Sequence, residues 1–273
     1  MATYLIQISR PLKFAKSLEL RNSRLPVFYI LDGNANFLTA AEICWRGETT
    51  VNWAGGGIVV AIGYPQDPTE TGHLYNFEGR NRDYTPCAAD GMPGEGIGNF
   101  GGTLGGADSF LDFVESELRP LVKSVLKGEG VEVAQEAFWG HSFGGLCVLH
   151  GLFTGKAGKF DTYYAVSPSI WWGEKFLVKE EEAFSGVNTR LELSFGLLEE
   201  ELERTSRESQ EDFEKRVVYA KEKAMGPNAR AMYKTFKENG KVGNVRLTVF
   251  DGEDHGTVST VGLLRALVQF FAD

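Results

Sequence analysis

The stretch EAFWGHSFGGLCVLHGLF, residues 136–153, decides the fold because it contains, in this order, the sequence patterns of a strand, a tight turn and a helix. EAFWG is a short apolar run typical of a buried strand, and GLCVLHGLF has the apolar content of a buried helix. Between them, GHSFG places Ser142 between two glycines. Glycines at a strand–turn–helix junction let a serine adopt a strained backbone conformation that exposes its hydroxyl. The pattern predicts a nucleophile at Ser142, and the alternative is an inert serine in a glycine bend.

Apolar, β-rich runs alternate with helical patterns on both sides of this stretch. The predicted strands are residues 3–8, 27–31, 57–64, 136–140, 161–167, 190–196 and 245–250. We expect the first strand to be antiparallel and the others to form βαβ units. Helices are predicted over 107–127, with a bend or an interruption at Pro120, and at the C-terminal STVGLLRALVQFFAD. The sequence therefore predicts an α/β fold with a mostly parallel central sheet and helices on both faces.

Composition narrows the functional classes. The 273 residues are 42% hydrophobic and 24% charged, which suits a globular α/β domain covering 1–273. The three cysteines are widely spaced and form no CxxC pair, which is untypical of a disulfide framework or a zinc site, so we expect no metal and no cofactor. A net charge of −9 disfavours binding to nucleic acid or to an anionic membrane. We find no membrane span or secretory signal and expect a cytoplasmic protein.

Two stretches depart from the strand–helix rhythm. Residues 91–106 belong to a glycine-rich run that we expect to form a loop at the edge of a pocket. Residues 199–239 are highly charged and helical in pattern. Charge runs are usually solvated faces, so the first interpretation is a solvated helical pair, and the second is a cap-like insertion over the active site.

A nucleophilic serine needs a base, because its hydroxyl is a poor nucleophile at its ordinary pKa. His73 lies in a loop, His141 is expected to point away from the serine, and His150 is expected to pack inside the helix that follows. His255 lies in DGEDHGT, between the last strand and the closing helix, and it keeps the order serine, acid, histidine. We therefore predict that His255 is the base.

The acid is expected after the strand that precedes the strand of the histidine, in FGLLEEELE at 195–203. Glu199, Glu200 and Glu201 all compete there, and a serine–histidine dyad without an acid is a further alternative. We favour Glu199, the first carboxylate after Gly196.

An oxyanion hole needs two backbone N–H groups. We assign these to Phe143, which follows the nucleophile, and to Asn34 in YILDGNANF.

At this point the chain resembles the putative-esterase group of α/β-hydrolases, which includes esterase D-type enzymes and siderophore esterases. The matching residues are LDGN at 31–34, VVAIGYP at 59–65, RDYTP at 82–86, GGADSFLDFVESELRP at 105–120, GHSFGG at 140–145, SPSIWWG at 167–173, GLLE at 196–199 and DHG at 254–256. RDYTP, GGADSFL and SPSIWW look most like the branch that cleaves trilactone siderophores. The resemblance implies the α/β-hydrolase fold, the same nucleophile, base and oxyanion donors, and an acid within GLLE.

The resemblance also implies a small-molecule ester substrate, which would include iron-loaded siderophores. A ferric tris-catecholate carries three negative charges, whereas a ferric tris-hydroxamate is neutral, and a chain of net charge −9 would repel the former unless a local basic patch intervened. Arg80 and Arg82 could supply that patch or could pair with nearby acids. We favour a hydroxamate ester of the fusarinine type, held by aromatic walls such as Trp171 and Trp172. The rival is another carboxylesterase of the esterase D type, acting on S-formylglutathione or on carbohydrate acetyl esters.

Overall fold

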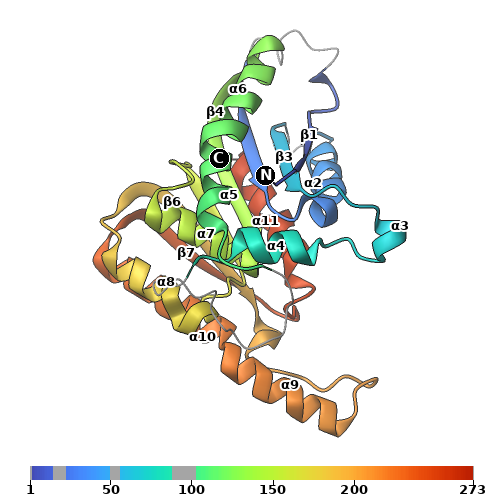
Figure 1. Cartoon of the computed structure of the whole chain (residues 1–273), viewed down its shortest axis with the longest axis vertical. Coiled ribbons are helices and arrows are strands. Elements are labelled where there is room, and N and C mark those ends of the chain that lie inside the picture. Colours follow the sequence, from blue (N-terminus) through green and yellow to red (C-terminus); the bar gives the residue numbers. More distant parts are fainter. Residues whose placement is uncertain (1, 15–22, 50–55, 88–102, 273) are drawn as a thin grey trace.

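A computed structural model describes residues 2–14, 23–49, 56–87 and 103–272, and in this part of the chain seven strands form one sheet (Figure 1). The strand order is β1-β3-β2-β4-β5-β6-β7. β1 runs antiparallel to β3, and the other neighbouring pairs are parallel, as predicted. The strands are β1 (Leu5–Ser9), β2 (Arg24–Ile30), β3 (Ile58–Gly63), β4 (Glu132–His141), β5 (Thr162–Val166), β6 (Val187–Gly196) and β7 (Val242–Phe250).

Helices cover both faces of the sheet (Figure 1). Their bounds are α2 (Gly33–Gly47), α3 (Pro68–Thr71), α4 (Phe77–Tyr84), α5 (Ala107–Phe113), α6 (Arg119–Gly128), α7 (Phe143–Thr154), α8 (Trp172–Ala183), α9 (Gln210–Lys223), α10 (Met225–Asn239) and α11 (Val258–Ala272), with a short 3₁₀ turn, η3 (Leu197–Glu199), after β6. α2 and α11 pack on one face, whereas α5, α6, α7, α8 and α10 pack on the other.

Alternating residues of the central strands supply the two layers of the core. On β2, Tyr29 belongs to the larger cluster under α7, whereas Phe28 and Ile30 belong to the cluster under α11, and all three are fully buried. A strand covered on both faces reads as a continuous apolar run, because side chains on either side of it are buried. This explains why β2, β3 and β5 are recognisable in the sequence as unbroken hydrophobic stretches.

The predicted helix over 107–127 is interrupted where its proline lies. A π-helical turn, η2 (Val114–Leu118), separates α5 from α6, and the Arg119 N–H donates to the carbonyl of Val114, five residues back. Pro120 has no N–H to give to an α-helical bond, and a π turn just before it lets the chain continue as a helix. Of the two alternatives predicted for Pro120, a bend or an interruption, the structure shows an interruption of the α-helix by a π-helical turn.

Residues 199–239 divide into two parts with different packing. α10 buries Met225, Met232 and Phe236 and packs against β6 and β7. In α9 only Lys223 is buried, and the helix projects from the lower end of the molecule in Figure 1.

Of the predicted glycine-rich loop at 91–106, residues 91–102 lie outside the described part of the chain. Across the described residues, no helix has the length and apolar character needed to cross a membrane.

Candidate active site

Ser142 lies at the turn between β4 and α7, with φ 59° and ψ −117°. Its N–H donates to the Val166 carbonyl at 3.0 Å, and its carbonyl accepts from the Leu146 N–H at 2.9 Å. A Cβ added at Gly140 would lie 2.3 Å from the backbone of Gly144. The strained turn therefore depends on a glycine at position 140, and it presents the Ser142 hydroxyl beyond the end of β4.

His255 lies in the loop between β7 and α11, and its Nε2 is 3.1 Å from the Oγ of Ser142. The side chain of Asp254 fixes this loop by accepting from the N–H groups of Gly256 and Thr257, at 2.8 and 2.9 Å. These hydrogen bonds, the one from Thr257 first, hold the pKa of Asp254 below its ordinary value. Asp254 therefore shapes the loop and does not face the imidazole as its acid.

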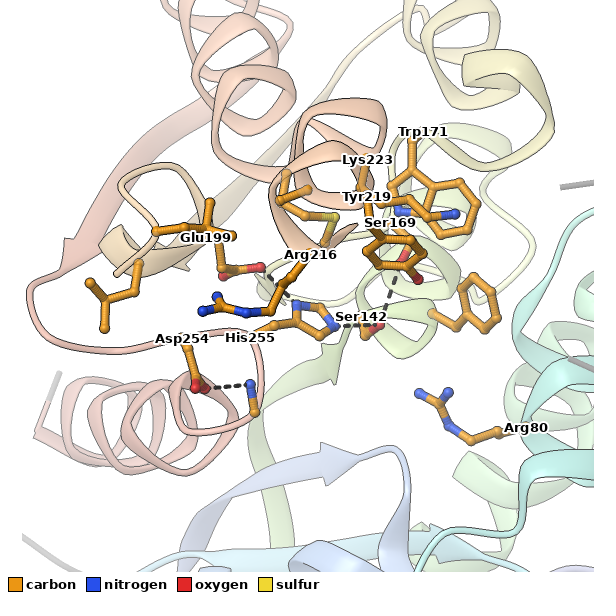
Figure 2. Close-up of a pocket in the computed structure, with 16 residues that line it drawn as sticks. Arg80, Ser142, Ser169, Trp171, Glu199, Arg216, Tyr219, Lys223, Asp254 and His255 are labelled. Carbon is orange, nitrogen blue, oxygen red and sulfur yellow. Dashed lines mark hydrogen bonds and ion pairs between the residues drawn. The ribbon is translucent and has the colours of Figure 1, made fainter. Parts of the chain in front are cut away.

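Glu199 lies on η3, and its Oε2 is 2.7 Å from the Nδ1 of His255 (Figure 2). Its other oxygen accepts from the hydroxyl of Ser167 at 2.5 Å and from the Gly196 N–H at 2.9 Å. An ionised carboxylate only accepts hydrogen bonds, so Nδ1 carries the proton and Nε2 faces the serine as an acceptor. Of the three glutamates that the sequence left open, the structure brings Glu199 to the histidine.

The other two glutamates face elsewhere. Glu200 forms an ion pair with Arg230 at 3.0 Å on α10, and Glu201 is exposed. Only 3% of the Glu199 side chain is exposed, so its carboxylate is held in a dry environment by specific donors. Burial of a hydrogen-bonded carboxylate beside an imidazole is the arrangement that fixes the tautomer of a catalytic histidine.

His141, which precedes the nucleophile, packs against the base. The centroids of the His141 and His255 rings are 4.7 Å apart, with the planes tilted by 40°. Burial, followed by the nearby His255 and Arg80, holds the pKa of His141 well below its ordinary value. His141 therefore stays neutral and supports the face of the His255 ring without adding a second positive charge.

The two predicted oxyanion donors lie at the N-termini of helices. Phe143 is the first residue of α7, and Asn34 is the second residue of α2. The side chain of Asn34 donates to the carbonyl of Tyr64 and accepts from its N–H, both at 2.8 Å, and these bonds tie the start of α2 to the end of β3. The oxyanion roles of the Phe143 and Asn34 N–H groups stay predictions.

A cavity of about 460 Å³ opens beside Ser142. Its lining residues are Arg80, Ser142, Phe143, Ser169, Trp171, Leu198, Glu199, Leu202, Arg216, Tyr219, Ala220, Lys223, Met225, Asp254, His255 and Gly256 (Figure 2). Such a volume is in the range of small-molecule sites, and aromatic and aliphatic walls with few polar groups are typical of them. The cavity can therefore hold an organic group larger than an acetyl beside the nucleophile.

Two of the cations in this cavity are paired with carboxylates. Arg80 forms a bidentate ion pair with the carboxylate of Asp32, at 2.9 and 3.2 Å, and is 8% exposed. Arg216 pairs with Glu208, at 2.8 Å to each carboxylate oxygen. Pairing of this kind cancels much of the field that each guanidinium would otherwise exert on a ligand.

Among the residues that the structure describes, no cluster of three or more histidine, cysteine, aspartate or glutamate side chains is arranged to hold a metal ion.

The sequence model of the putative esterase family matches residues 6–230. The chain belongs to this esterase family.

Relatives agree with this assignment. The esterase is 39% identical over 279 residues to the siderophore triacetylfusarinine C esterase of Aspergillus fumigatus, covering 99% of this chain and 89% of that protein. It is 35% identical to the siderophore enterobactin esterase of Emericella nidulans, with 93% and 85% covered. The solved structure of siderophore hydrolase EstB from Aspergillus nidulans superimposes with a TM-score of 0.86 at 36% identity, with 98% and 90% covered. The predicted α/β-hydrolase fold and the ester-hydrolase class are confirmed.

Two residues predicted to bind substrate in this esterase lie outside the described cavity. Arg82 pairs with the neighbouring Asp83 at 2.6 and 2.7 Å, and this pair faces Tyr64 and not the nucleophile. Trp172 is 1% exposed and packs in the core, because adjacent residues at a helix start point in different directions. Arg80 and Trp171 do line the cavity.

Sequence reasoning missed several groups of the esterase site. Ser167 and Ser169 come from the SPSIWW block, which was used only for the family resemblance. Arg216, Tyr219, Ala220 and Lys223 line the cavity from α9 and follow the spacing of one helix face. That spacing was visible in the sequence, but the surrounding charges favoured a solvated helix.

Proposed function

We propose that this esterase hydrolyses the ester bonds of iron-chelating siderophores, and that ferric hydroxamate macrolactones of the fusarinine type are its preferred substrates. The observation that carries the proposal is the hydrogen-bond chain from Glu199 through His255 to Ser142, which ends in a cavity of about 460 Å³. The relatives named for triacetylfusarinine C and enterobactin support the substrate class.

The reaction follows from the geometry of the chain of hydrogen bonds. The Oγ of Ser142 attacks the ester carbonyl while the Nε2 of His255 takes its proton, and the N–H groups of Phe143 and Asn34 donate to the developing oxyanion. As the tetrahedral intermediate collapses, His255 gives the proton to the leaving alcohol oxygen. Water then attacks the acyl-enzyme with His255 as base, and the acid product and Ser142 are released. Throughout, Glu199 stabilises the imidazolium through Nδ1–H.

The pairing of cations in the cavity favours a neutral chelate. Arg80 is committed to Asp32 and Arg216 to Glu208, so neither guanidinium meets a substrate as an uncompensated charge. The third cation in the cavity wall, Lys223, is 3% exposed, and its ammonium lies over the ring of Trp171. A trianionic tris-catecholate would approach a chain of net charge −9 with little local compensation. A ferric tris-hydroxamate is neutral and would instead gain from contact with Trp171, Tyr219 and Leu202, which line the cavity.

The test is mass spectrometry of the products formed from iron-loaded and iron-free triacetylfusarinine C and from ferric enterobactin. Wild type is expected to give linear and monomeric acids, and Ser142→Ala none. Retained hydrolysis in Ser142→Ala would contradict the mechanism, and a larger kcat/KM for ferric enterobactin would contradict the preference for hydroxamates. A panel with S-formylglutathione and acetylated sugars tests the rival esterase D-type activity, which predicts turnover of these small esters and none of the macrocycle.

A further inference from the structure

Helix α9 supplies one wall of the cavity but has little contact with the rest of the molecule. Arg216, Tyr219, Ala220 and Lys223 lie on one face of the helix and line the cavity. Val218 is 58% exposed, and of the residues in α9 only Lys223 is buried. Helices with so little buried apolar surface draw their position from a small number of specific contacts.

A second cavity borders a neighbouring face of α9. It measures about 470 Å³, and it shares Glu199, Leu202 and Ala220 with the cavity beside the nucleophile. Between α9 and α10, Ala224 has φ 46° and ψ 48°, a left-handed conformation that costs a residue with a Cβ about 1–2 kcal/mol. The helix therefore borders two cavities on adjacent faces and is joined to α10 through a strained residue.

One contact between α9 and the catalytic side of the molecule is that of Lys223 with Trp171. The Nζ of Lys223 is 3.1 Å from the centroid of the Trp171 ring and 5.0 Å from that of Tyr219 (Figure 2). Trp171 follows Ser169, whose N–H donates to the carbonyl of the nucleophile at 3.1 Å. An ammonium over an indole face is the most favourable pairing of this kind, and it strengthens when water is excluded.

The buried ammonium is costly, which argues that its position serves the site. Lys223 is 3% exposed, and burial lowers its pKa to about 8, whereas the charge of Glu222 acts in the opposite direction. An apolar side chain would fill the same space without this desolvation cost. A lysine at this position places its ammonium against the indole of Trp171 in the wall of the cavity.

We propose that Lys223 is a specificity-determining residue of this esterase: through its contact with Trp171 it holds α9 as the wall against which bulky ester substrates bind, so that they are favoured over small esters. This inference rests on the proposed function for the identity of the bulky substrate. A small ester reacts once its carbonyl reaches Ser142 and the oxyanion donors. A siderophore arm extends into the cavity and also needs the α9 wall, so losing that wall raises KM for large substrates most.

The experiment compares Lys223→Met with Lys223→Arg, which keeps a cation over the indole. The readout is the ratio of kcat/KM for ferric triacetylfusarinine C to kcat/KM for p-nitrophenyl acetate. We expect this ratio to fall about tenfold in Lys223→Met, mainly because KM for the large substrate rises. A tenfold change corresponds to about 1.4 kcal/mol. In Lys223→Arg the ratio should stay within about threefold of the wild-type value. Lys215→Met is the matched control, because Lys215 is 68% exposed on α9 and pairs only with Glu211 among the partners described. An unchanged ratio in Lys223→Met would overturn the proposal.

Two further readouts separate this inference from its alternatives. Hydrogen exchange along 210–223 should accelerate in Lys223→Met and not in Lys223→Arg, whereas a merely structural role would lower the thermal midpoint and reduce both kcat/KM values alike. If wild type hydrolyses p-nitrophenyl acetate but no siderophore, the proposed function fails. The role of Lys223 is then decided by p-nitrophenyl esters of increasing acyl bulk, for which Lys223→Met should lose selectivity for the bulky members and an unchanged selectivity would refute it.

Discussion

Ser167 and Ser169 contact opposite ends of one hydrogen-bond chain. The hydroxyl of Ser167 donates to Glu199 at 2.5 Å, and the hydroxyl of Ser169 lies 3.4 Å from that of Ser142. Ser167 adopts a positive φ of 41° directly after β5, which turns its side chain toward β6. The loop after β5 thus sets the distance between the nucleophile and the acid, although it supplies neither of them.

Replacing Ser167 by alanine should lower kcat without a matching change in KM. The change leaves one oxygen of a buried carboxylate with the Gly196 N–H as its remaining donor, and a hydrogen bond to a charged group contributes about 1.5–3 kcal/mol, or roughly 10- to 100-fold in rate. Steady-state kinetics on an activated ester measures the effect. Ser169→Ala removes only a long contact and should cost less, so equal losses in the two variants would argue against this reading of Ser167.

Glu199→Gln should reduce kcat by roughly 10²- to 10⁴-fold, because an amide cannot stabilise the imidazolium and does not enforce the same tautomer. Glu201→Gln is the matched control, since Glu201 comes from the same run of glutamates and is exposed. We expect wild-type rates for that variant. A dyad mechanism predicts instead that the two variants behave alike, and burst kinetics with a p-nitrophenyl ester separates the two outcomes.

The two glycines of the G-x-S-x-G pattern should differ in their tolerance of a side chain. At Gly140 an added Cβ would meet the backbone of Gly144 at 2.3 Å, whereas at Gly144 the nearest atoms are at 3.6 Å. Gly140→Ala should displace the turn, lower stability by about 1–3 kcal/mol or more, and abolish labelling of Ser142 by a fluorophosphonate. Gly144→Ala should fold and still be labelled. Similar labelling of both variants would show that the turn can relax around Gly140.

His150 should make stability depend on pH. Its ring nitrogens bond Glu180 and Asp108, each at 2.8 Å, and although burial opposes the charge these carboxylates raise the pKa of His150 above its ordinary value. A raised pKa in the folded state contributes stability that is fully present below the unfolded value of about 6.5, and this stability is lost as the pH rises through the folded value.

Glu180→Gln should therefore lower the free energy of unfolding most at mildly acidic pH, by about 1–3 kcal/mol, and progressively less toward pH ~9. Urea titrations across this pH range measure the difference. Glu182→Gln is the control, because Glu182 is exposed on the same helix. A difference between wild type and Glu180→Gln that did not vary with pH would contradict a charged His150.

Local patterns were enough to predict the sheet and two members of the hydrogen-bond chain. The strands β2, β3 and β5 are buried on both faces and form continuous apolar runs in the sequence. Each of the seven strands was predicted to within a few residues of its observed ends. Ser142 was predicted as nucleophile from its glycines, and His255 as base from its place between the last strand and the closing helix. Each of these two predictions rests on residues within one loop and its flanking elements, so neither needed knowledge of contacts between distant parts of the chain.

Features that depend on tertiary contacts were harder to predict. Glu199, Glu200 and Glu201 are alike in sequence, and Glu199 is distinguished by tertiary contacts, because Ser167, Gly196 and His255 all hydrogen-bond to its carboxylate. Arg82 was grouped with Arg80 by proximity, yet Arg80 pairs with Asp32 at the cavity and Arg82 with its own neighbour. Lys223 lay within a charge run that favoured a solvated helix, and only the position of Trp171 distinguishes it.

The two donors to Oε1 of Glu199, Ser167 and Gly196, precede it in the chain, as does the strand from which it emerges, and the donor to Oε2 is His255 in the loop after β7. None of these three donors lies within residues 200–223. Insertions, deletions or exchanges within 200–223 can therefore alter what the enzyme accepts while its acid stays in place, so that in descendants of this sequence substrate range can diverge faster than chemistry.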